Sequence, residues 1–88
     1  MPVTAPPMVT VRVLLFASYA ETLGFDSTEL SLEAPATVAD VLDRLRAQPG
    51  GQRLPPKPLC AINLTHVHLE TQLSSGDELA ILPPLAGG

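Results

Sequence analysis

The residues that are best suited to carry out chemistry are those of the ending Pro-Pro-x-x-Gly-Gly, residues 83–88. A free carboxylate such as that of Gly88 is a poor acyl donor, but as an acyl-adenylate it can be attacked by sulfur or by an amine. Glycine has no Cβ, so the ending can thread a narrow slot and adopt the φ angles that a partner's site demands. Its last four residues extend about 13 to 14 Å beyond the prolines, enough to enter a pocket on another protein. We predict that Gly88 reacts and that Leu85, Ala86 and Gly87 give it access.

The internal candidates for chemistry are weaker. His66 and His68 share one face of a predicted strand, but no third ligand accompanies them, so we predict no metal site. Cys60 lies among apolar neighbours, without a nearby His, Lys or helix start to lower the pKa of its thiol, and we expect it to be packed. The pair Gly50-Gly51 lacks the Lys-Ser/Thr of a phosphate-binding loop. We therefore expect no catalysis by this chain alone.

Composition limits the class of protein. A chain of 88 residues with 45% hydrophobic content fits one small domain, which buries a little over ~60% of its unfolded-state surface. The net charge of −4, with only five basic residues, argues against nucleic acid as a partner and suits a partner with a basic docking face. One cysteine cannot form an intrachain disulfide, and the apolar runs are too short to span a membrane. We expect a cytoplasmic protein that binds neither nucleic acid nor membrane.

The first third of the chain should form a strand, a short helix and a second strand. Residues 1–7 contain three prolines and no periodic pattern, so we expect an unstructured leader. From residue 8 apolar side chains alternate as in a strand. Ser18 and Glu21 have the spacing of a capping box, and Gly24 supplies a C-terminal stop, which predicts a short helix. Residues 28–33 then alternate as a half-exposed strand.

The main helix should begin after Thr37, its N-cap, with Asp40 at the third helical position, and end near Gln48. Its apolar residues recur at helical spacing and form one stripe, made up of Val38, Val41, Leu42 and Leu45. A Pro- and Gly-rich loop follows, then two short extended pieces on either side of Thr65, a turn at residues 74–77 and a closing strand at residues 78–82.

This order predicts an α+β fold of the ubiquitin-like β-grasp type, a mixed sheet with one main helix across one face. The first and last strands should be adjacent and parallel. The domain should span residues 8–84, between the leader of residues 1–7 and a flexible tail of residues 85–88.

Strand parity places a second set of apolar residues on the helix-free face. If Val9, Val11, Val13 and Leu15 pack under the helix, then Phe16 and Leu82 must point away from it. We expect a docking patch there, next to the tail, formed by Phe16, Leu82, Pro83 and Pro84 and rimmed by His66. The same pattern would also arise from the few apolar residues that any surface carries.

Three stretches of the sequence carry a resemblance to a known family. The ending "LSSGDELAILPPLAGG", the early segment "RVLLFASYAETLG" and "AINLTHV" resemble the small subunit of molybdopterin synthase. That family consists of sulfur carriers related to the carrier of thiazole synthesis and to ubiquitin-like proteins. The resemblance spans residues 9–88.

The resemblance implies a mechanism. An E1-like activating enzyme would use ATP to adenylate Gly88, and a sulfur donor would convert it to a thiocarboxylate. The large subunit, in a heterotetramer of two small and two large subunits, would then receive the tail, and the sulfur would pass to cyclic pyranopterin monophosphate. No cofactor would bind this chain itself. Phe16, Leu82 and the two prolines match the family's docking surface, whereas His66 replaces a larger apolar residue and Leu82 an aromatic one.

Two alternatives use the same terminus. The chain could carry sulfur for thiazole or tRNA thiolation, or it could be a ubiquitin-like modifier joined to lysines by an isopeptide bond. Because all three functions require Gly88, the tail alone does not distinguish them.

Overall fold

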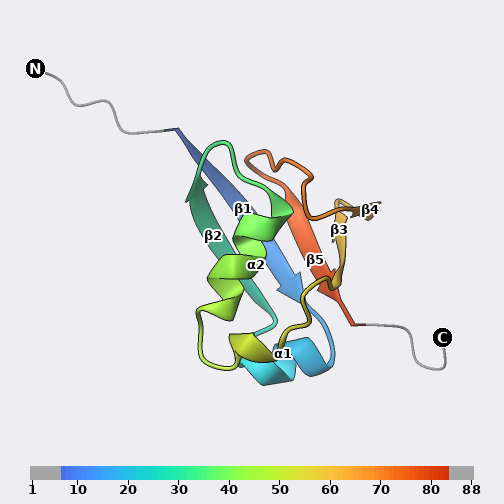
Figure 1. Ribbon diagram of the computed structural model, residues 1–88. Helices are drawn as coiled ribbons and strands as arrows, with labels where there is room; N and C mark the ends of the chain where they lie inside the picture. Colours follow the sequence, from blue (N-terminus) through green and yellow to red (C-terminus); the bar gives the residue numbers. More distant parts are fainter. Residues whose placement is uncertain (1–6, 84–88) are drawn as a thin grey trace, which may run out of the picture.

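The computed structural model describes residues 7–83 of the 88, so the predictions for residues 1–6 and 84–88 lie outside it (Figure 1). Within the described residues the strands form one sheet in the order β2-β1-β5-β3-β4. The strands are β1 (Met8–Leu15), β2 (Ser27–Glu33), β3 (Leu59–Ile62), β4 (Thr65–Val67) and β5 (Glu78–Leu82). Pro7, which we expected in the leader, accepts a hydrogen bond at its carbonyl from the Ala34 N–H (2.9 Å).

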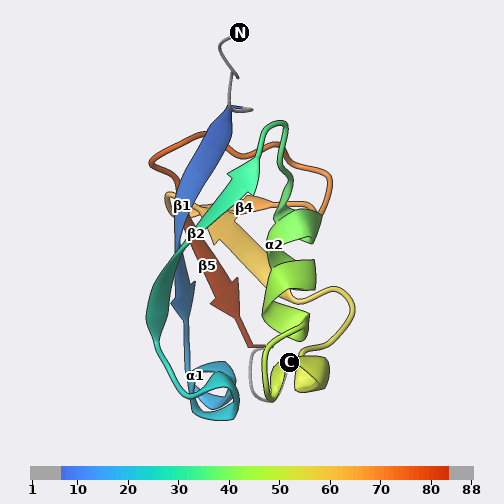
Figure 2. The same ribbon diagram turned by 90° about the vertical axis from the view of Figure 1, so that its left-hand side faces the viewer.

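The sheet is mixed, with β1 between β2 and β5. β1 pairs with β2 antiparallel and with β5 parallel, and β3 pairs antiparallel with both β5 and β4. The long helix α2 (Val38–Arg46) crosses one face of the sheet, as the two views at right angles show (Figures 1 and 2). The predicted α+β β-grasp architecture, with adjacent parallel first and last strands, is therefore confirmed.

The core lies between α2 and the sheet. All four apolar residues of the predicted helix stripe have no exposed surface, and the residues of β1 and β5 that face them are buried as well. They are Val38, Val41, Leu42 and Leu45 on α2, and Val9, Val11, Val13, Leu15, Leu79 and Ile81 on the strands. No helix among residues 7–83 is long and apolar enough to cross a membrane.

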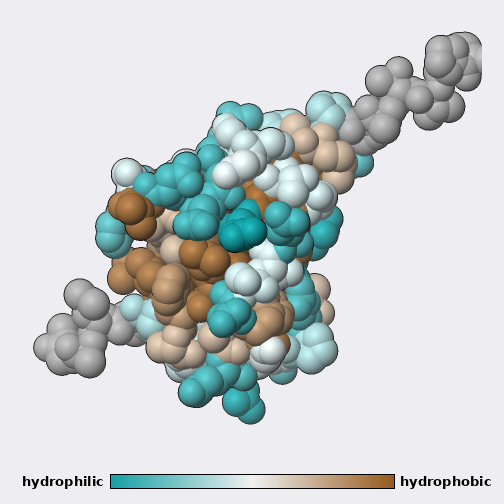
Figure 3. All heavy atoms as spheres, turned by 180° about the vertical axis from the view of Figure 1, so that it is seen from behind, coloured by the Kyte–Doolittle hydropathy of each residue, from teal (hydrophilic) through white to brown (hydrophobic). Residues whose placement is uncertain are grey.

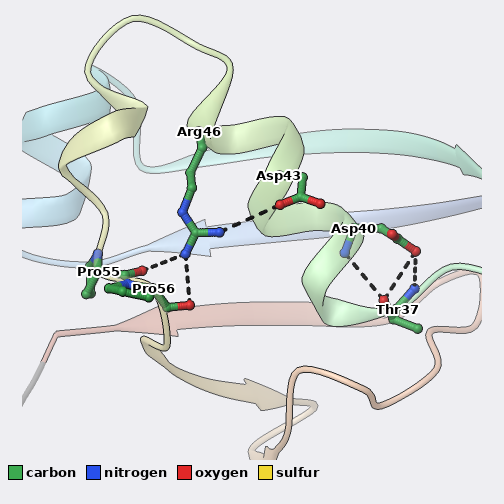
Figure 4. Close-up of polar contacts among 6 residues, drawn as sticks. All are labelled: Thr37, Asp40, Asp43, Arg46, Pro55 and Pro56. Atoms are coloured by element: carbon green, nitrogen blue, oxygen red, sulfur yellow. Dashed lines mark hydrogen bonds and ion pairs between the residues drawn. The ribbon is translucent and has the colours of Figure 1, made fainter.

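The start of α2 is fixed by the predicted cap. The Thr37 side-chain oxygen accepts a hydrogen bond from the Asp40 N–H (3.4 Å), and the Asp40 carboxylate accepts one from the Thr37 N–H (2.9 Å; Figure 4). These reciprocal bonds form a capping box, which satisfies N–H groups that the first helical turn leaves free. The helix ends at Arg46, two residues earlier than predicted, with Ala47 as C-cap.

The capping box predicted for the short helix α1 (Ser18–Leu23) is wrong. Ser18 is already helical, and the N-cap is Ala17, which makes no side-chain capping bond. The Tyr19 N–H instead donates to the Phe16 carbonyl (3.1 Å), so the chain turns into the helix one residue earlier. Ala17 has φ 50° and ψ −126°, a conformation that costs a residue with a Cβ about 1–3 kcal/mol. Gly24 ends the helix at φ 85°, as predicted.

The loop between α2 and β3 is tied to the helix. It contains one 3-10 turn, η1 (Gly51–Arg53). The Arg46 guanidinium donates to the carbonyl oxygens of Pro55 (2.6 Å) and Pro56 (3.0 Å) and lies 3.7 Å from the Asp43 carboxylate (Figure 4). A side chain from α2 therefore holds the chain that leads into β3.

Gly51 offers a test of this loop geometry. A Cβ at residue 51 would collide with the carbonyl oxygen of Leu45 and with the Cα of Arg46, backbone atoms that cannot rotate away. We expect Gly51→Ala to lower the free energy of unfolding by about 2 kcal/mol or more, measured by urea denaturation. Gly24→Ala is the matched control, since a Cβ there meets nothing within 4 Å and costs only the strain of a positive φ, about 1 kcal/mol. Equal losses in the two variants would contradict this account.

Candidate functional site

The sheet face opposite α2, here called the outer face, carries two cross-strand apolar rows. In the first row Leu14 pairs with Ala80, Ala80 with Ala61, and Ala61 with His66. In the second, Leu82 pairs with Leu59. Side chains of paired residues point to the same face, so these rows form a continuous surface over β1, β5, β3 and β4.

This surface is open to solvent. Phe16 and Leu59 are each 44% exposed, and the side chains between them are partly buried. Seen from behind, apolar side chains gather over one half of the outer face (Figure 3). We call this area the apolar patch and define it by the residues that the registers place together, namely Leu14, Leu59, Ala80 and Leu82, with the exposed Phe16 directly after β1 and Pro83 directly after β5.

The other half of the outer face is polar. Arg12 pairs with Glu29 on one side and with Glu78 on the other, so opposite charges alternate across three strands. Two register pairs further toward the start of β1, the hydroxyls of Thr10 and Ser31 lie 2.9 Å apart, within hydrogen-bond distance. The apolar patch therefore occupies only the half of the face where β1 and β5 end, next to the point where the tail begins.

A hydrogen-bond network fixes the beginning of β5. The Asp77 carboxylate accepts bonds from the Ser74 N–H (2.8 Å) and the Asn63 side-chain amide (3.3 Å). Asn63 also accepts at its side-chain oxygen from the Glu78 N–H (3.1 Å). The predicted turn at residues 74–77 thus sets where β5 starts and, through its five residues, where Pro83 lies.

The strand registers bring Leu82 to the outer face at the apolar patch and His66 to its rim, while Phe16 and Pro83 directly follow the ends of β1 and β5. Pro84 and residues 85–88 lie outside the described residues. The binding roles of all of them stay predictions. Leu59 was missed, because its parity is known only once its pairing with Leu82 is known.

Comparison with known proteins identifies related chains. A model described as the ThiS family matches residues 13–88. The molybdopterin synthase sulfur carrier subunit of Escherichia coli strain K12 is 37% identical over 81 residues, which cover 89% of this chain and 99% of that protein.

Solved structures agree on the fold. SAMP1, the small archaeal modifier protein 1 of Haloferax volcanii, has a TM-score of 0.78 at 31% identity and covers 90% of this chain and 99% of its own. A complex of subunits 1 and 2 of the molybdopterin-converting factor from Helicobacter pylori has a TM-score of 0.64 at 22% identity, with coverages of 91% and 100%. At that identity the complex shows the fold alone.

Cys60 directly follows Leu59 of the apolar patch in the sequence, but its side chain faces the core. Its side chain is 2% exposed, and its Sγ lies 3.6 Å from the Pro58 carbonyl oxygen as a weak donor. Burial raises the pKa of the Cys60 thiol from 9.0 to about 11. The pKa of Tyr19 is also raised, by burial and by the charge of Cys60. The thiol is therefore protonated at neutral pH and is no nucleophile, so the expected packed thiol is confirmed.

His66 and His68 are exposed, and residues 7–83 contain no cluster of three metal-ligating side chains.

The Cys60 pKa predicts how stability depends on pH. The folded state holds the thiol proton more tightly than the unfolded state, so this contribution to stability is complete below about pH 9 and is lost as pH rises toward about 11. We expect the free energy of unfolding of the native protein to fall more steeply between pH 8.5 and pH 11 than that of Cys60→Ala. In Cys60→Ala the pKa of Tyr19 keeps the increase that burial causes and loses the part that Cys60 causes, so the change at Tyr19 acts in the same direction as the loss of the thiol. Equal pH slopes in urea denaturation would contradict the assignment.

Proposed function

The chain belongs to the ThiS family, and from this we propose that it is the sulfur carrier subunit of molybdopterin synthase. The observation that carries the proposal is its relation to the Escherichia coli carrier subunit, which extends over 99% of that protein. The family match also runs to Gly88 and so includes the Gly-Gly ending. The apolar patch beside the start of the tail supports a function in which the tail is delivered to a partner.

We assign the chemistry to Gly88. An E1-like enzyme would transfer AMP from ATP to the Gly88 carboxylate, releasing pyrophosphate and forming an acyl-adenylate. Sulfide-level sulfur from a donor would displace AMP and leave a thiocarboxylate. Its sulfur would form a bond to cyclic pyranopterin monophosphate, and water would then cleave the acyl–sulfur bond and restore the Gly88 carboxylate. ATP would be a substrate of the activating enzyme, and this chain itself would bind no cofactor. The use of ATP fits a cytoplasmic location of the protein.

The proposed partner is the large subunit of molybdopterin synthase, in an assembly of two small and two large subunits. Subunits 1 and 2 of the Helicobacter pylori molybdopterin-converting factor form a protein–protein complex, which supports a pairing of this kind. Phe16 and Leu59 would supply the exposed apolar area, and Leu82 and Pro83 would carry the contact to the start of the tail. Docking of the patch would therefore bring residues 84–88 to the partner's surface, with Leu85, Ala86 and Gly87 giving Gly88 access to its pocket.

Two other functions have support of their own. The likeness to small archaeal modifier protein 1 favours a ubiquitin-like modifier, which would form an isopeptide bond between Gly88 and a lysine. A carrier for thiazole or tRNA thiolation would use the same Gly88, and the match to the ThiS family alone does not separate it from the proposed function. The thiocarboxylate or adenylate is the same group in every case, so the partner must set the specificity.

A transfer assay tests the proposed function. We expect the Gly88 thiocarboxylate to lose its sulfur, followed by mass spectrometry of the intact protein, when it is mixed with the large subunit and cyclic pyranopterin monophosphate. Thiazole synthase with its own substrates should not accept the sulfur. Transfer to thiazole synthase alone would favour the second carrier function, and lysine-linked conjugates in a complete activation mixture would favour the modifier.

Two tail variants serve as controls in the same assay. Deletion of Gly88, or one residue added after it, should abolish sulfur transfer without changing the unfolding curve. Full activity of an extended protein that mass spectrometry shows to be untrimmed would contradict the role of Gly88.

The apolar patch is tested by charge substitution. We expect Phe16→Glu or Leu82→Glu to weaken binding of the large subunit by at least about 1.4 kcal/mol, a tenfold change in the dissociation constant, because each buries a charge against an apolar surface. Leu64→Glu is the matched control, since Leu64 is apolar and 95% exposed but lies in the β3–β4 turn. Calorimetric titration measures the affinities. If Phe16→Glu or Leu82→Glu chiefly unfolds the domain, the side chain belongs to the core and not to a docking surface.

A further inference from the structure

A hollow lies next to the apolar patch, where β1 passes into α1. It is lined by five apolar residues, one carboxylate and one hydroxyl, which are Leu14, Leu15, Phe16, Ala17, Ala20, Asp26 and Ser27. Leu14 and Phe16 also belong to the apolar patch, so the hollow is continuous with the proposed docking surface. An apolar wall with a single negative group is the chemistry that accommodates a long aliphatic side chain with a positive end.

The carboxylate of Asp26 is available for such a contact. Asp26 is exposed, and its side chain takes part in none of the hydrogen bonds or ion pairs found among residues 7–83. Only its backbone carbonyl is engaged, by the Leu15 N–H at 2.9 Å. None of the five basic residues of the chain lines the hollow. Nothing in the described part of the chain therefore neutralises this charge.

Ala17 gives a second, independent indication. Residues 16–19 form a tight turn, closed by the bond from Tyr19 to Phe16, and Ala17 occupies the position in which φ 50° and ψ −126° favour glycine. The Ala17 methyl group is exposed and lines the hollow, so packing within this chain does not compensate the strain. This exposed methyl group is therefore available to contact a molecule outside the chain.

We propose that the hollow receives a lysine or arginine side chain of the large subunit. Its methylene groups would pack on Phe16 and Ala17, and its charged end would reach the Asp26 carboxylate. The net charge of −4 favours approach of a basic surface, and continuity with the apolar patch means that both are covered in one docking event. This inference rests on the proposed function, because it names a contact of the same complex.

The test compares two isosteric losses of charge. We expect Asp26→Asn to weaken binding of the large subunit by about threefold to tenfold at low ionic strength, with the difference shrinking as salt is added. Glu33→Gln is the matched control, since Glu33 is exposed at the opposite end of β2, where it pairs with Met8. It should change the dissociation constant by less than about twofold.

Ala17→Gly supplies a readout that a structural role would not give. Glycine adopts the observed φ and ψ freely, so we expect this variant to unfold at the same or a higher urea concentration than the native protein and yet to bind more weakly. Native affinity in Ala17→Gly would overturn the inference, and so would an effect of Asp26→Asn no larger than that of Glu33→Gln. In either case, tight binding by the native protein would still support the large subunit as the partner. Failure of the native protein to bind the large subunit would overturn both proposals.

Discussion

Alternation of side chains along each strand is the constraint on which the rest of this structure depends. Once Val11 and Val13 lie beneath α2, Arg12 between them and Leu14 after Val13 must point to the opposite face. Parallel pairing of β1 with β5 extends the same parity to Leu79 and Ile81, and so to Ala80 and Leu82 on the other face. The alternation that buries the core residues therefore also exposes the residues of the apolar patch. The patch lies beside Pro83 because β1 and β5 both end there.

The sequence predicted most of the fold because its signals were local and mutually consistent. The Thr37–Asp40 cap, the α2 stripe and the turn before β5 each depend on residues a few positions apart. The start of α1 was mispredicted because Ser18 and Glu21 have the right spacing, whereas the turn at Ala17 is decided by backbone closure to Tyr19. Leu59 was missed for another reason. It joins the apolar patch through its pairing with Leu82, far along the chain, and that register is a property of the folded sheet.

In the proposed function, the group that carries sulfur is separate from the protein's own thiol. Cys60 is packed in the core, where burial keeps its thiol protonated, while the proposed reacting group is a main-chain carboxylate outside the described residues. A carboxylate has little reactivity until another protein activates it, so the domain contributes position and recognition. Its stability can then be tuned through α2 and its partners without altering the group that reacts.

The parallel pairing of β1 and β5 also has a practical consequence for handling the protein. Because both strands run the same way, Pro7 and Pro83 lie at opposite ends of the sheet, separated by the length of β1, about 26 Å for eight residues (Figure 1). An affinity tag or reporter fused before Pro7 would leave the apolar patch uncovered. A circular permutant, in contrast, would need a linker long enough to travel back along the sheet, and joining Gly88 to that linker would convert the proposed reacting carboxylate into an amide.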